Sequence, residues 1–274
     1  MISIISVAKN NLPGLEKTYR SIASQDIDFT RIEWVVKDAA STDHTVEWLK
    51  LLEKEKKLPN FTWNSSPDEG LYDGMNIGMS LSKGQYILFL NSGDYLYTND
   101  VLSKTAAVIS ENRDNLPTFL FGDDIVDNID KKFIFRKARD INYLWHSLPC
   151  SHQAIFYNSS HIGAVKYNLR YKICGDYQFT IEIYKNSYQG HKHLGFIVPV
   201  FEAGGHAIQQ RLQLCEEAYV IKKEILGLPF LIRSFSFMAG YFNNILMHYF
   251  PRSYHVHRRL LDKFVANPDK RPAK

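Results

Sequence analysis

The apolar residues in the first half of the chain fall into short runs, separated by stretches with helical spacing. The apolar runs predict buried strands at 2–7, 32–36, 61–63, 86–90 and 119–121. The amphipathic stretches predict helices at 15–24, from Asp43 to Lys56, just before Gly84 and at 101–111. This alternation is typical of an α/β fold with a Rossmann-like, mostly parallel sheet and helices on both faces.

The second half of the chain loses this regular alternation. The pattern indicates a basic β-hairpin arm at 131–139, another strand at 152–157 and a helix at 176–185. The remainder is helical and increasingly basic. We therefore expect one α/β domain over 1–207 and a basic, amphipathic helical extension over 208–274.

Composition indicates a folded chain from a reducing compartment. Of the 274 residues, 45% are hydrophobic, which is enough for a large core and argues against disorder. The cysteines Cys150, Cys174 and Cys215 are widely spaced and form no Cys-x-x-Cys motif, so neither a disulfide framework nor a zinc site is expected. A cytoplasmic location fits this cysteine usage.

The C-terminal region combines apolar and basic residues. The last 25 residues hold seven lysines and arginines against two aspartates, which favours an anionic surface as partner. Pro229 and Arg233 interrupt the apolar segment 225–238, and no run is long enough to span a membrane. The phenylalanines of this region suit either an ordinary packing helix or a helix lying in a membrane interface. The short apolar N-terminus is expected to be a strand rather than a signal peptide.

Aspartates accompany several predicted strands at the edge where open α/β sheets bind ligands. Asp38 closes the second strand, Asp94 follows the fourth in the run NSGD, and Asp73 lies in the run DEGLYDGMN between them. Carboxylates there suit Mg²⁺ or Mn²⁺ held against a diphosphate. Considered alone, Asp94 is better explained as a turn residue, and Asp38 equally well as a helix cap or Asx turn. No G-x-G-x-x-G follows the first strand, which disfavours a nicotinamide- or flavin-binding domain.

Asp176 opens a predicted helix in the run YKICGDYQFTIEIY. An acid at the start of a helix beside a cleft can take a proton from a hydroxyl as a general base, and it can equally be a helix cap. His146, His152 and His206 are candidates for metal ligands or acids. The alternative for each histidine is a structural group with its hydrogen bonds satisfied.

The chain resembles family 2 glycosyltransferases of the GT-A fold over roughly residues 1–230, because five motifs occur in the order of that family. The motifs are SIISVAKNN, EWVVKDAASTDHT, SPDEGLYDGMNIGMSLSKGQYILFLNSGD, SLPCSHQAIFY and YKICGDYQFTIEIYKNSY. The resemblance is closest to bacterial enzymes that make exopolysaccharides of the colanic-acid and amylovoran type. It implies a GT-A domain in which 1–100 bind a nucleotide-diphosphate sugar and 101–207 bind the acceptor.

The resemblance also implies roles for single residues. Asp38 resembles the nucleoside-binding acid and Asp73 a second donor-site acid. Asp94 resembles the metal ligand that ends the DxD-type motif, of which NSGD retains one acid, and Asp176 resembles the inverting catalytic base. Further donor contacts are implied at Val7, Asn76, Asn91 and Gly93, with His152 and His206 as additional candidates.

The implied activity is the Mn²⁺- or Mg²⁺-dependent transfer of a hexose, with inversion, to a saccharide acceptor in bacterial surface polysaccharide biosynthesis. The acceptor is expected on a polyprenyl diphosphate lipid, so the enzyme would work in the cytoplasm against the anionic inner face of the plasma membrane. A homodimer through the C-terminal helices is the alternative use of that region. A non-catalytic nucleotide-binding or membrane-scaffold protein with the same fold is the alternative function. A nucleic-acid binder is disfavoured, because the cleft is acidic and no recognition motif is present.

Overall fold

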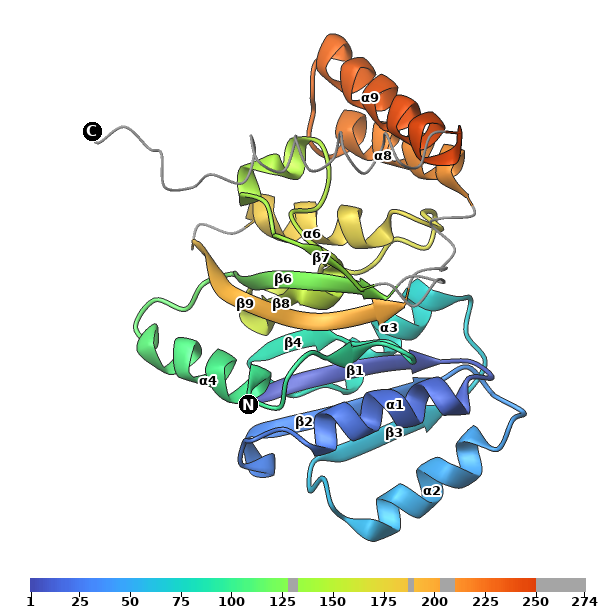
Figure 1. Ribbon diagram of the computed structural model, residues 1–274, viewed down its shortest axis with the longest axis vertical. Helices are drawn as coiled ribbons and strands as arrows, with labels where there is room; N and C mark the ends of the chain where they lie inside the picture. Colours follow the sequence, from blue (N-terminus) through green and yellow to red (C-terminus); the bar gives the residue numbers. More distant parts are fainter. Residues whose placement is uncertain (128–132, 187–189, 203–209, 250–274) are drawn as a thin grey trace.

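The computed structural model describes residues 1–127, 133–186, 190–202 and 210–249, and a single mixed sheet runs through its centre (Figure 1). The strands follow the order β3-β2-β1-β4-β8-β6-β9-β5 across the sheet, and β7 pairs with β6. Their bounds are β1 (Ile2–Ala8), β2 (Ile32–Asp38), β3 (Phe61–Ser65), β4 (Tyr86–Phe89), β5 (Tyr95–Leu96), β6 (Phe119–Asp127), β7 (Phe133–Arg136), β8 (Ile155–Asn158) and β9 (His191–Glu202). The helices are α1 (Leu12–Ala23), α2 (Thr45–Glu55), α3 (Leu71–Leu81), α4 (Val101–Glu111), α5 (Ser159–Ile162), α6 (Gly175–Asn186), α8 (Arg211–Glu224) and α9 (Phe230–Tyr249), with 3₁₀ turns η1 (Phe29–Arg31), η2 (Ile141–Trp145) and η3 (His152–Ala154).

The first half of the chain forms the parallel part of the sheet, as the sequence pattern predicts. β2 and β4 both pair with β1, and β3 pairs with β2, all in parallel. Every residue of β1 and β2 is buried, which is typical of strands covered on both faces. Helix α1 begins at Leu12, earlier than predicted, because the Asn11 side chain caps it and proline is tolerated in a first helical turn.

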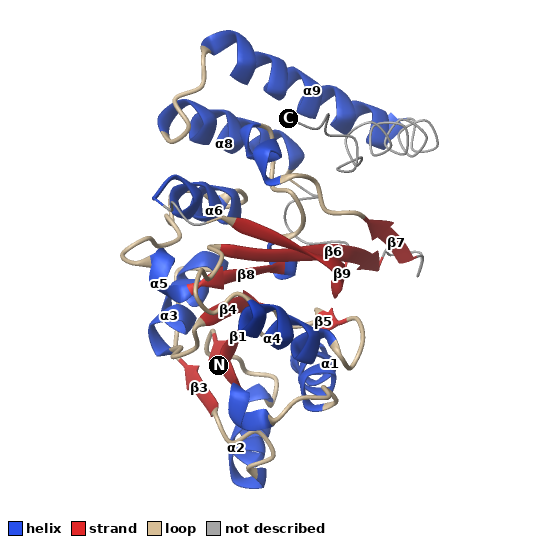
Figure 2. Cartoon of the chain, turned by 90° about the vertical axis from the view of Figure 1, so that its left-hand side faces the viewer, coloured by secondary structure: helices blue, strands red, loops and turns tan. Residues whose placement is uncertain are grey.

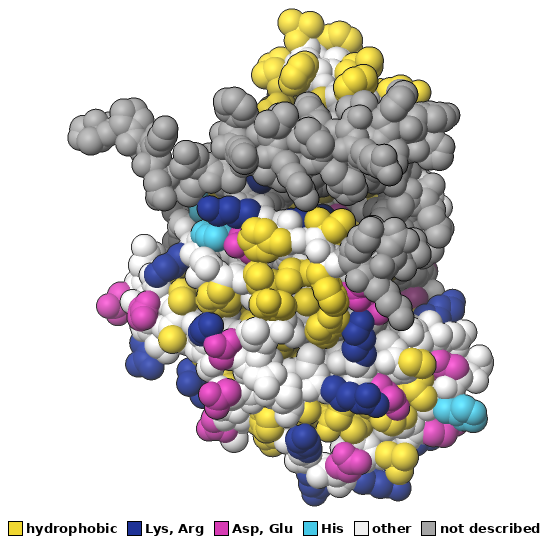
Figure 3. Space-filling model, in the orientation of Figure 1, with side chains coloured by type: hydrophobic (Ala, Val, Ile, Leu, Met, Phe, Trp, Pro, Cys, Tyr) yellow, Lys and Arg dark blue, Asp and Glu magenta, His cyan; other side chains and the backbone are white. Residues whose placement is uncertain are grey.

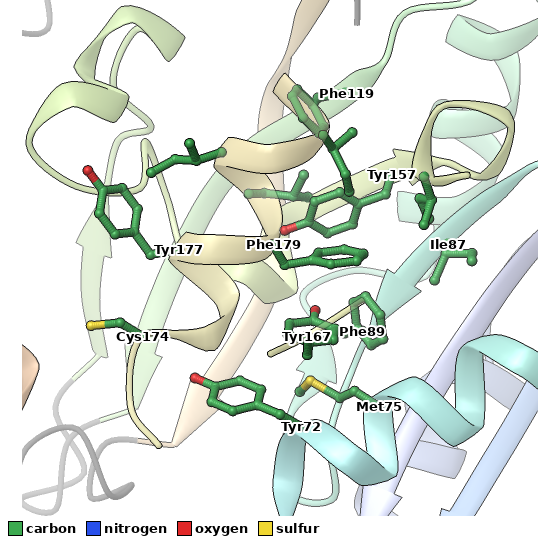
Figure 4. Packing of buried hydrophobic residues seen from close by; sticks show 14 of the residues in the cluster. Tyr72, Met75, Ile87, Phe89, Phe119, Tyr157, Tyr167, Cys174, Tyr177 and Phe179 are labelled. Atoms are coloured by element: carbon green, nitrogen blue, oxygen red, sulfur yellow. The ribbon is translucent and has the colours of Figure 1, made fainter. Parts of the chain in front are cut away.

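Helices cover both faces of this parallel half, and each face has its own apolar cluster. Ile5 and Val7 of β1 point into the cluster that includes α3 and α6, whereas Ile4 and Ala8 belong to the cluster beneath α1, α2 and α4. In the first cluster the rings of Tyr167 and Phe179 stack with centroids 4.2 Å apart (Figure 4). The strand ends that carry the candidate acids are therefore held between two packed layers.

Beyond β4 the sheet contains antiparallel pairs and curls (Figure 2). β8 is antiparallel to both β4 and β6, and β6 continues to Asp127, well past the predicted run 119–121. Of the predicted hairpin arm 131–139, β7 is described and pairs antiparallel with β6, whereas 131–132 lie outside the described residues. The apolar pattern does not predict β9, because its first half alternates exposed and half-buried positions and resembles surface.

The C-terminal extension forms the helix pair α8 and α9 at one end of the molecule, with α2 at the other end (Figure 1). Ile221 of α8 is fully buried in the same cluster as α3 and α6. On α9, Ser236 is buried, and a Cβ at Gly240 would lie 3.4 Å from the Cys215 sulfur of α8. Within the described ranges no helix has both the length and the apolar character needed to cross a bilayer.

Candidate active site

The candidate site lies at the carboxyl edge of β1, β2 and β4. β1 lies between the other two strands, so the ends of β2 and β4 are about 10 Å apart at the usual strand spacing. The loop after β4 folds back onto β1, where the backbone N–H of Ser92 donates to the carbonyl of Val7 at 3.2 Å. This edge therefore brings together Val7, Asp38 and the segment 91–94.

Asp38 is completely buried at the end of β2. Its carboxylate accepts hydrogen bonds from the backbone N–H and hydroxyl of Ser41, at 3.0 and 2.5 Å, and from the hydroxyl of Ser65 at 2.6 Å. The bonds to Ser41 make the local turn that the sequence left open, and the bond to Ser65 ties the turn to β3. Direct contact between Asp38 and a nucleoside would require the loop after β2 to shift, so the donor role of Asp38 stays a prediction.

A buried ion pair beneath this edge was not predicted. Lys37, whose side chain has no exposed surface, donates to a carboxylate oxygen of Asp68 at 3.0 Å and to the carbonyls of Asp38 and Ser66 at 2.7 and 2.6 Å. Lysine is almost never buried without such partners. Its position inside the apolar strand run IEWVVKD is the signal that could have found it. The pair fixes the loop between β3 and α3.

The run DEGLYDGMN forms the entry of α3. Gly70 precedes the helix with φ = 116°, a conformation that favours glycine. In the first turn, the Asp73 carboxylate accepts the Glu69 backbone N–H at 3.0 Å. The Asn76 amide instead bonds both the backbone N–H and the carbonyl of Tyr167, each at 2.9 Å. Asn76 therefore joins α3 to the segment before α6, a structural contact that the sequence did not indicate.

The turn after β4 positions Asp94. Gly93 has φ = 103°, and the Thr18 hydroxyl of α1 donates to the backbone carbonyls of Asn91 and Asp94 at 3.1 and 2.6 Å. Asp94 is 7% exposed, and its carboxylate accepts a hydrogen bond from the Gln153 amide at 3.1 Å. Burial raises the pKa of the Asp94 carboxyl to about 6, although Gln153 opposes this shift.

The turn after β4 can supply some of the ligands of a divalent cation. A cation beside Asp94 would offset the cost of burying its charge, and Asn91 Oδ1 in the same turn is buried with no hydrogen-bond partner among the described residues. Both groups offer oxygen, the ligand atom that Mg²⁺ and Mn²⁺ favour. The described ranges contain no group of three or more His, Cys, Asp or Glu residues that could hold a metal.

The turn η3 brings the second predicted acid close to the first. Gln153 contacts Asp94, and the neighbouring His152 places Nδ1 3.4 Å from a carboxylate oxygen of Asp176 at the start of α6. His152 Nε2 is buried and has no hydrogen-bond partner in the described part of the chain. Asp124 of β6 accepts the Ser151 backbone N–H at 2.9 Å and so holds the start of η3. Asp94, His152 and Asp176 thus form one site, linked through two consecutive side chains.

The other histidine candidates lie elsewhere or outside the described residues. His146 Nδ1 is 2.7 Å from the Ser236 hydroxyl of α9, and burial lowers the pKa of this imidazole to about 4. It is therefore a neutral packing group in the contact with the C-terminal helices. His206 lies within 203–209, outside the described residues.

Comparison with known proteins identifies a matching family. Residues 3–165 match the family described as Glycosyl transferase family 2. A PGL/p-HBAD biosynthesis glycosyltransferase of Mycobacterium tuberculosis is 32% identical over 212 residues, which cover 75% of this chain and 78% of that protein. A GalNAc(5)-diNAcBac-PP-undecaprenol beta-1,3-glucosyltransferase of Campylobacter jejuni is 25% identical over 135 residues, or 48% of this chain and 41% of that protein.

Solved structures share the fold at low sequence identity. TarS 1–349 of S. aureus in complex with UDP-GlcNAc has a TM-score of 0.65 and 18% identity, covering 90% of this chain and 73% of that one. The mannosyltransferase PcManGT of Pyrobaculum calidifontis, in complex with GDP-Man and Mn²⁺, has a TM-score of 0.63 and 14% identity, covering 88% of this chain and 69% of that one. These matches confirm the GT-A fold. A particular similarity to colanic-acid or amylovoran enzymes stays a prediction.

Proposed function

Since the chain belongs to glycosyl transferase family 2, we propose that it transfers a hexose, with inversion and with a divalent cation, from a nucleotide-diphosphate sugar to a saccharide acceptor. The observation that carries this proposal is the linked site of Asp94, His152 and Asp176. One carboxylate lies at the donor edge of the sheet and the other opens α6 beside it. This arrangement supports a donor held by the first acid and an acceptor activated by the second.

We assign each part of the donor to a group of residues by their positions in the fold. We assign the nucleoside to the edge formed by Val7, Asp38 and Asp73, and the diphosphate to the turn of Asn91 and Gly93. Asp94, with Asn91, would hold the Mn²⁺ or Mg²⁺ ion, which when bound offsets the charge that develops on the leaving diphosphate. These assignments follow from the position of the turn beyond β4, where ligands of open sheets bind.

Asp176 is assigned as the base. Its carboxylate oxygen Oδ1 accepts the Tyr177 backbone N–H at 2.8 Å, and Oδ2 faces His152 at 3.4 Å. Asp176 takes the proton of the acceptor hydroxyl, which attacks the anomeric carbon on the face opposite the nucleotide, so that the configuration inverts. His152 orients the carboxylate from the donor side. No second carboxylate is assigned as a nucleophile, which agrees with a single displacement.

A panel of donors tests the proposal. Thermal unfolding would be followed with UDP-, GDP- and dTDP-sugars, each with Mn²⁺, Mg²⁺ or EDTA, because a ligand that binds only the native state raises the midpoint. We expect one nucleotide to raise it in a metal-dependent way and to be consumed when an acceptor is added. Binding without any turnover would favour the non-catalytic alternative, and indifference to every nucleotide would contradict both.

We further propose that the acceptor is carried on a polyprenyl diphosphate lipid in surface polysaccharide biosynthesis, and that the enzyme works in the cytoplasm on the inner face of the plasma membrane. The Campylobacter relative is named for an undecaprenol-linked acceptor, which supports this choice. The exposed side of α9 also supports it. Leu231, Phe235, Met238 and Phe242 are 78%, 67%, 59% and 56% exposed.

These four residues, the α9 stripe, recur every three or four positions and so lie within about 60° of one helical face. The stripe forms an apolar surface at the end of the molecule (Figure 3). The opposite side of α9 packs on α8 through Ser236 and Phe237. Contiguous exposed apolar side chains are typical of interaction surfaces, whereas single exposed apolar residues are ordinary.

Charge favours an anionic membrane as the partner of the α9 stripe. The sequence 225–261 contains no aspartate or glutamate, and it includes Arg233, Arg252, Arg258 and Arg259. Each basic residue near an acidic leaflet contributes about 1 kcal/mol of attraction. Burial of apolar side chains in the interface adds to this attraction.

Vesicle co-sedimentation tests this surface. The protein should sediment with vesicles of phosphatidylglycerol and phosphatidylcholine, not with phosphatidylcholine alone, and high salt should release it. The variant Phe235→Gln/Met238→Gln should bind at least about tenfold less, since the apolar contribution is lost. The control Leu51→Gln removes an exposed apolar side chain from α2, at the far end of the molecule, and should bind normally. Loss of self-association instead of vesicle binding would identify the stripe as a dimer interface.

A further inference from the structure

The segment immediately before Asp176 is held by a carboxylate from outside the family-matched region. Glu217 of α8 accepts the backbone N–H groups of three consecutive residues, Lys172, Ile173 and Cys174, each at 2.9 Å. Asp176 follows only two residues later, in the first turn of α6. The match to the family ends at residue 165, so neither this contact nor α8 is part of it.

Glu217 is itself held in place. The Gln213 amide, one turn earlier on α8, donates to Glu217 Oε1 at 2.9 Å. The thiol of Cys174 lies 3.4 Å from the Leu214 carbonyl of the same helix. Hydrogen bonds from N–H groups to a carboxylate are among the strong ones, so three of them on one side chain order the segment firmly.

The same segment is also held by α3. The Tyr72 hydroxyl of α3 donates to the carbonyl of Ile173 at 2.6 Å. A Cβ on Gly175 would lie 2.7 Å from the Tyr72 ring, so only glycine permits this close approach of α3 to the start of α6. Figure 4 shows Tyr72 reaching from α3 toward Cys174. The backbone before Asp176 is thus clamped between α3 and α8.

We propose that Glu217 is a positioning residue for the base, which it serves by holding the backbone of 172–174 and hence the carboxylate of Asp176. The inference rests on the base role given to Asp176 in the proposed function. It makes α8 part of the catalytic apparatus rather than an appendage. Displacement of a reacting group by about 1 Å can cost up to about 100-fold in rate, so a relaxed segment would slow turnover while the donor contacts of the turn after β4 stay in place.

The test compares Glu217→Gln with its neighbour Glu216→Gln. Glu217→Gln replaces one acceptor oxygen by an NH₂ group that cannot accept from the backbone N–H groups. Glu216 is exposed on the same helix and undergoes the same change of charge. The rate measured is that of donor hydrolysis, in which water is the acceptor and nucleoside diphosphate is released. The donor used is the one in the panel that gives the largest thermal shift. We expect kcat to fall about 10- to 100-fold in Glu217→Gln, with donor KM and thermal shift unchanged, and no effect in Glu216→Gln.

A double-mutant cycle with Asp176→Asn separates positioning from a general loss of structure. If Glu217 acts through Asp176, Glu217→Gln has no further effect on kcat once Asp176 is replaced. Equal losses in both backgrounds would overturn the inference, as would normal kcat in Glu217→Gln. Normal kcat in Asp176→Asn alone would instead overturn the proposed base.

A second variant tests the inference if Glu217→Gln does not fold. Tyr72→Phe removes only the hydroxyl that holds the Ile173 carbonyl from the α3 side. It should reproduce the fall in kcat at constant donor KM, because it releases the same segment. Normal kcat in a folded Tyr72→Phe variant, together with an unfolded Glu217→Gln, would show that the clamp serves stability alone and would overturn the inference.

Discussion

At the scale of single residues, the candidate acids differ in how much the protein already uses them. The Asp38 carboxylate already accepts three hydrogen bonds from two serines. Asp94 is also buried and accepts a hydrogen bond from Gln153, but burial still raises the pKa of its carboxyl to about 6. Asp176 is partly exposed, with 22% of its side chain accessible beside His152. Capacity for new partners thus lies with Asp94 for a cation and with Asp176 for an acceptor proton.

Replacing Asp94 tests the cation assignment. Asp94→Asn keeps the shape and can keep a hydrogen bond to Gln153, but it removes the charge that would attract a divalent ion. We expect the Mn²⁺-dependent part of nucleotide binding to fall at least about tenfold, measured by titration calorimetry with and without EDTA. The exposed acid at Asp26 provides the matched control, Asp26→Asn. Unchanged Mn²⁺ dependence in Asp94→Asn would move the ligand role to another group.

Replacing Asp176 tests the base. Asp176→Asn removes basicity while preserving size, so turnover should fall by about two to four orders of magnitude while nucleotide affinity stays the same. Steady-state kinetics and donor titration would measure the two quantities separately. Glu182→Gln, on the same helix, is the control. Near-normal turnover in the first variant would shift the role to His152, whose Nε2 is buried without a described partner.

At the scale of elements, a buried polar contact joins the C-terminal helices to the α/β domain. Lys222 of α8 is 4% exposed and donates to the Ser236 hydroxyl of α9 at 2.7 Å. The same hydroxyl is 2.7 Å from His146 Nδ1, just after η2. Burial lowers the pKa of the Lys222 ammonium to about 8, which means that its charge is costly where it lies.

The sign of the resulting pH dependence follows from linkage. The pKa of Lys222 is about 8 in the native state, whereas in the unfolded chain it has the ordinary lysine value of 10.5, so the free energy of unfolding should rise between these two pH values. Lys222→Met should remove that rise and increase stability at pH 7 by about 1–3 kcal/mol, because it buries no charge. Urea unfolding of both proteins at pH 7 and 9.5 measures this. If the free energies of unfolding of Lys222→Met and the unchanged protein differed more at pH 9.5 than at pH 7, the assignment would be contradicted.

At the scale of the whole molecule, the two C-terminal helices have different relations to the core. α8 buries Ile221 in the cluster with α3 and α6, and it carries Glu217. α9 exposes large apolar side chains between 230 and 242 and lies on α8 with its other side. The division predicted at 207/208 therefore separates the sheet from a helix that shares its core. Truncated chains test whether this division is a domain boundary.

Two truncations separate these roles. A chain ending at Gly227 keeps α8 and should unfold cooperatively and retain the metal-dependent thermal shift with nucleotide, but lose binding to anionic vesicles. A chain ending at Glu202 loses Ile221 and Glu217, so we expect it to aggregate or to melt without a sharp transition. Differential scanning calorimetry and co-sedimentation distinguish these outcomes. A stable, nucleotide-binding chain 1–202 would instead support an independent domain.

The sequence by itself determined the parallel half of the fold and the places of its acids. Short apolar runs bounded by turn residues favour interior strands, and the carboxyl ends of parallel strands share one edge, so local pattern alone placed Asp38 and Asp94 at that edge. The family motifs likewise determined the GT-A class, because they occupy contiguous runs of the chain.

Only the tertiary structure decided the contacts that cross the chain. β9 alternates like a surface strand and gains its place from pairing with β6, a long-range effect that local pattern does not record. Gln153 reaches Asp94 across 59 positions and Glu217 reaches Cys174 across 43, and nothing near either residue in the sequence indicates its partner. A hydrogen bond depends on distance and direction in space, so polar side chains distant in sequence acquire their roles only when the sheet and helices bring them together.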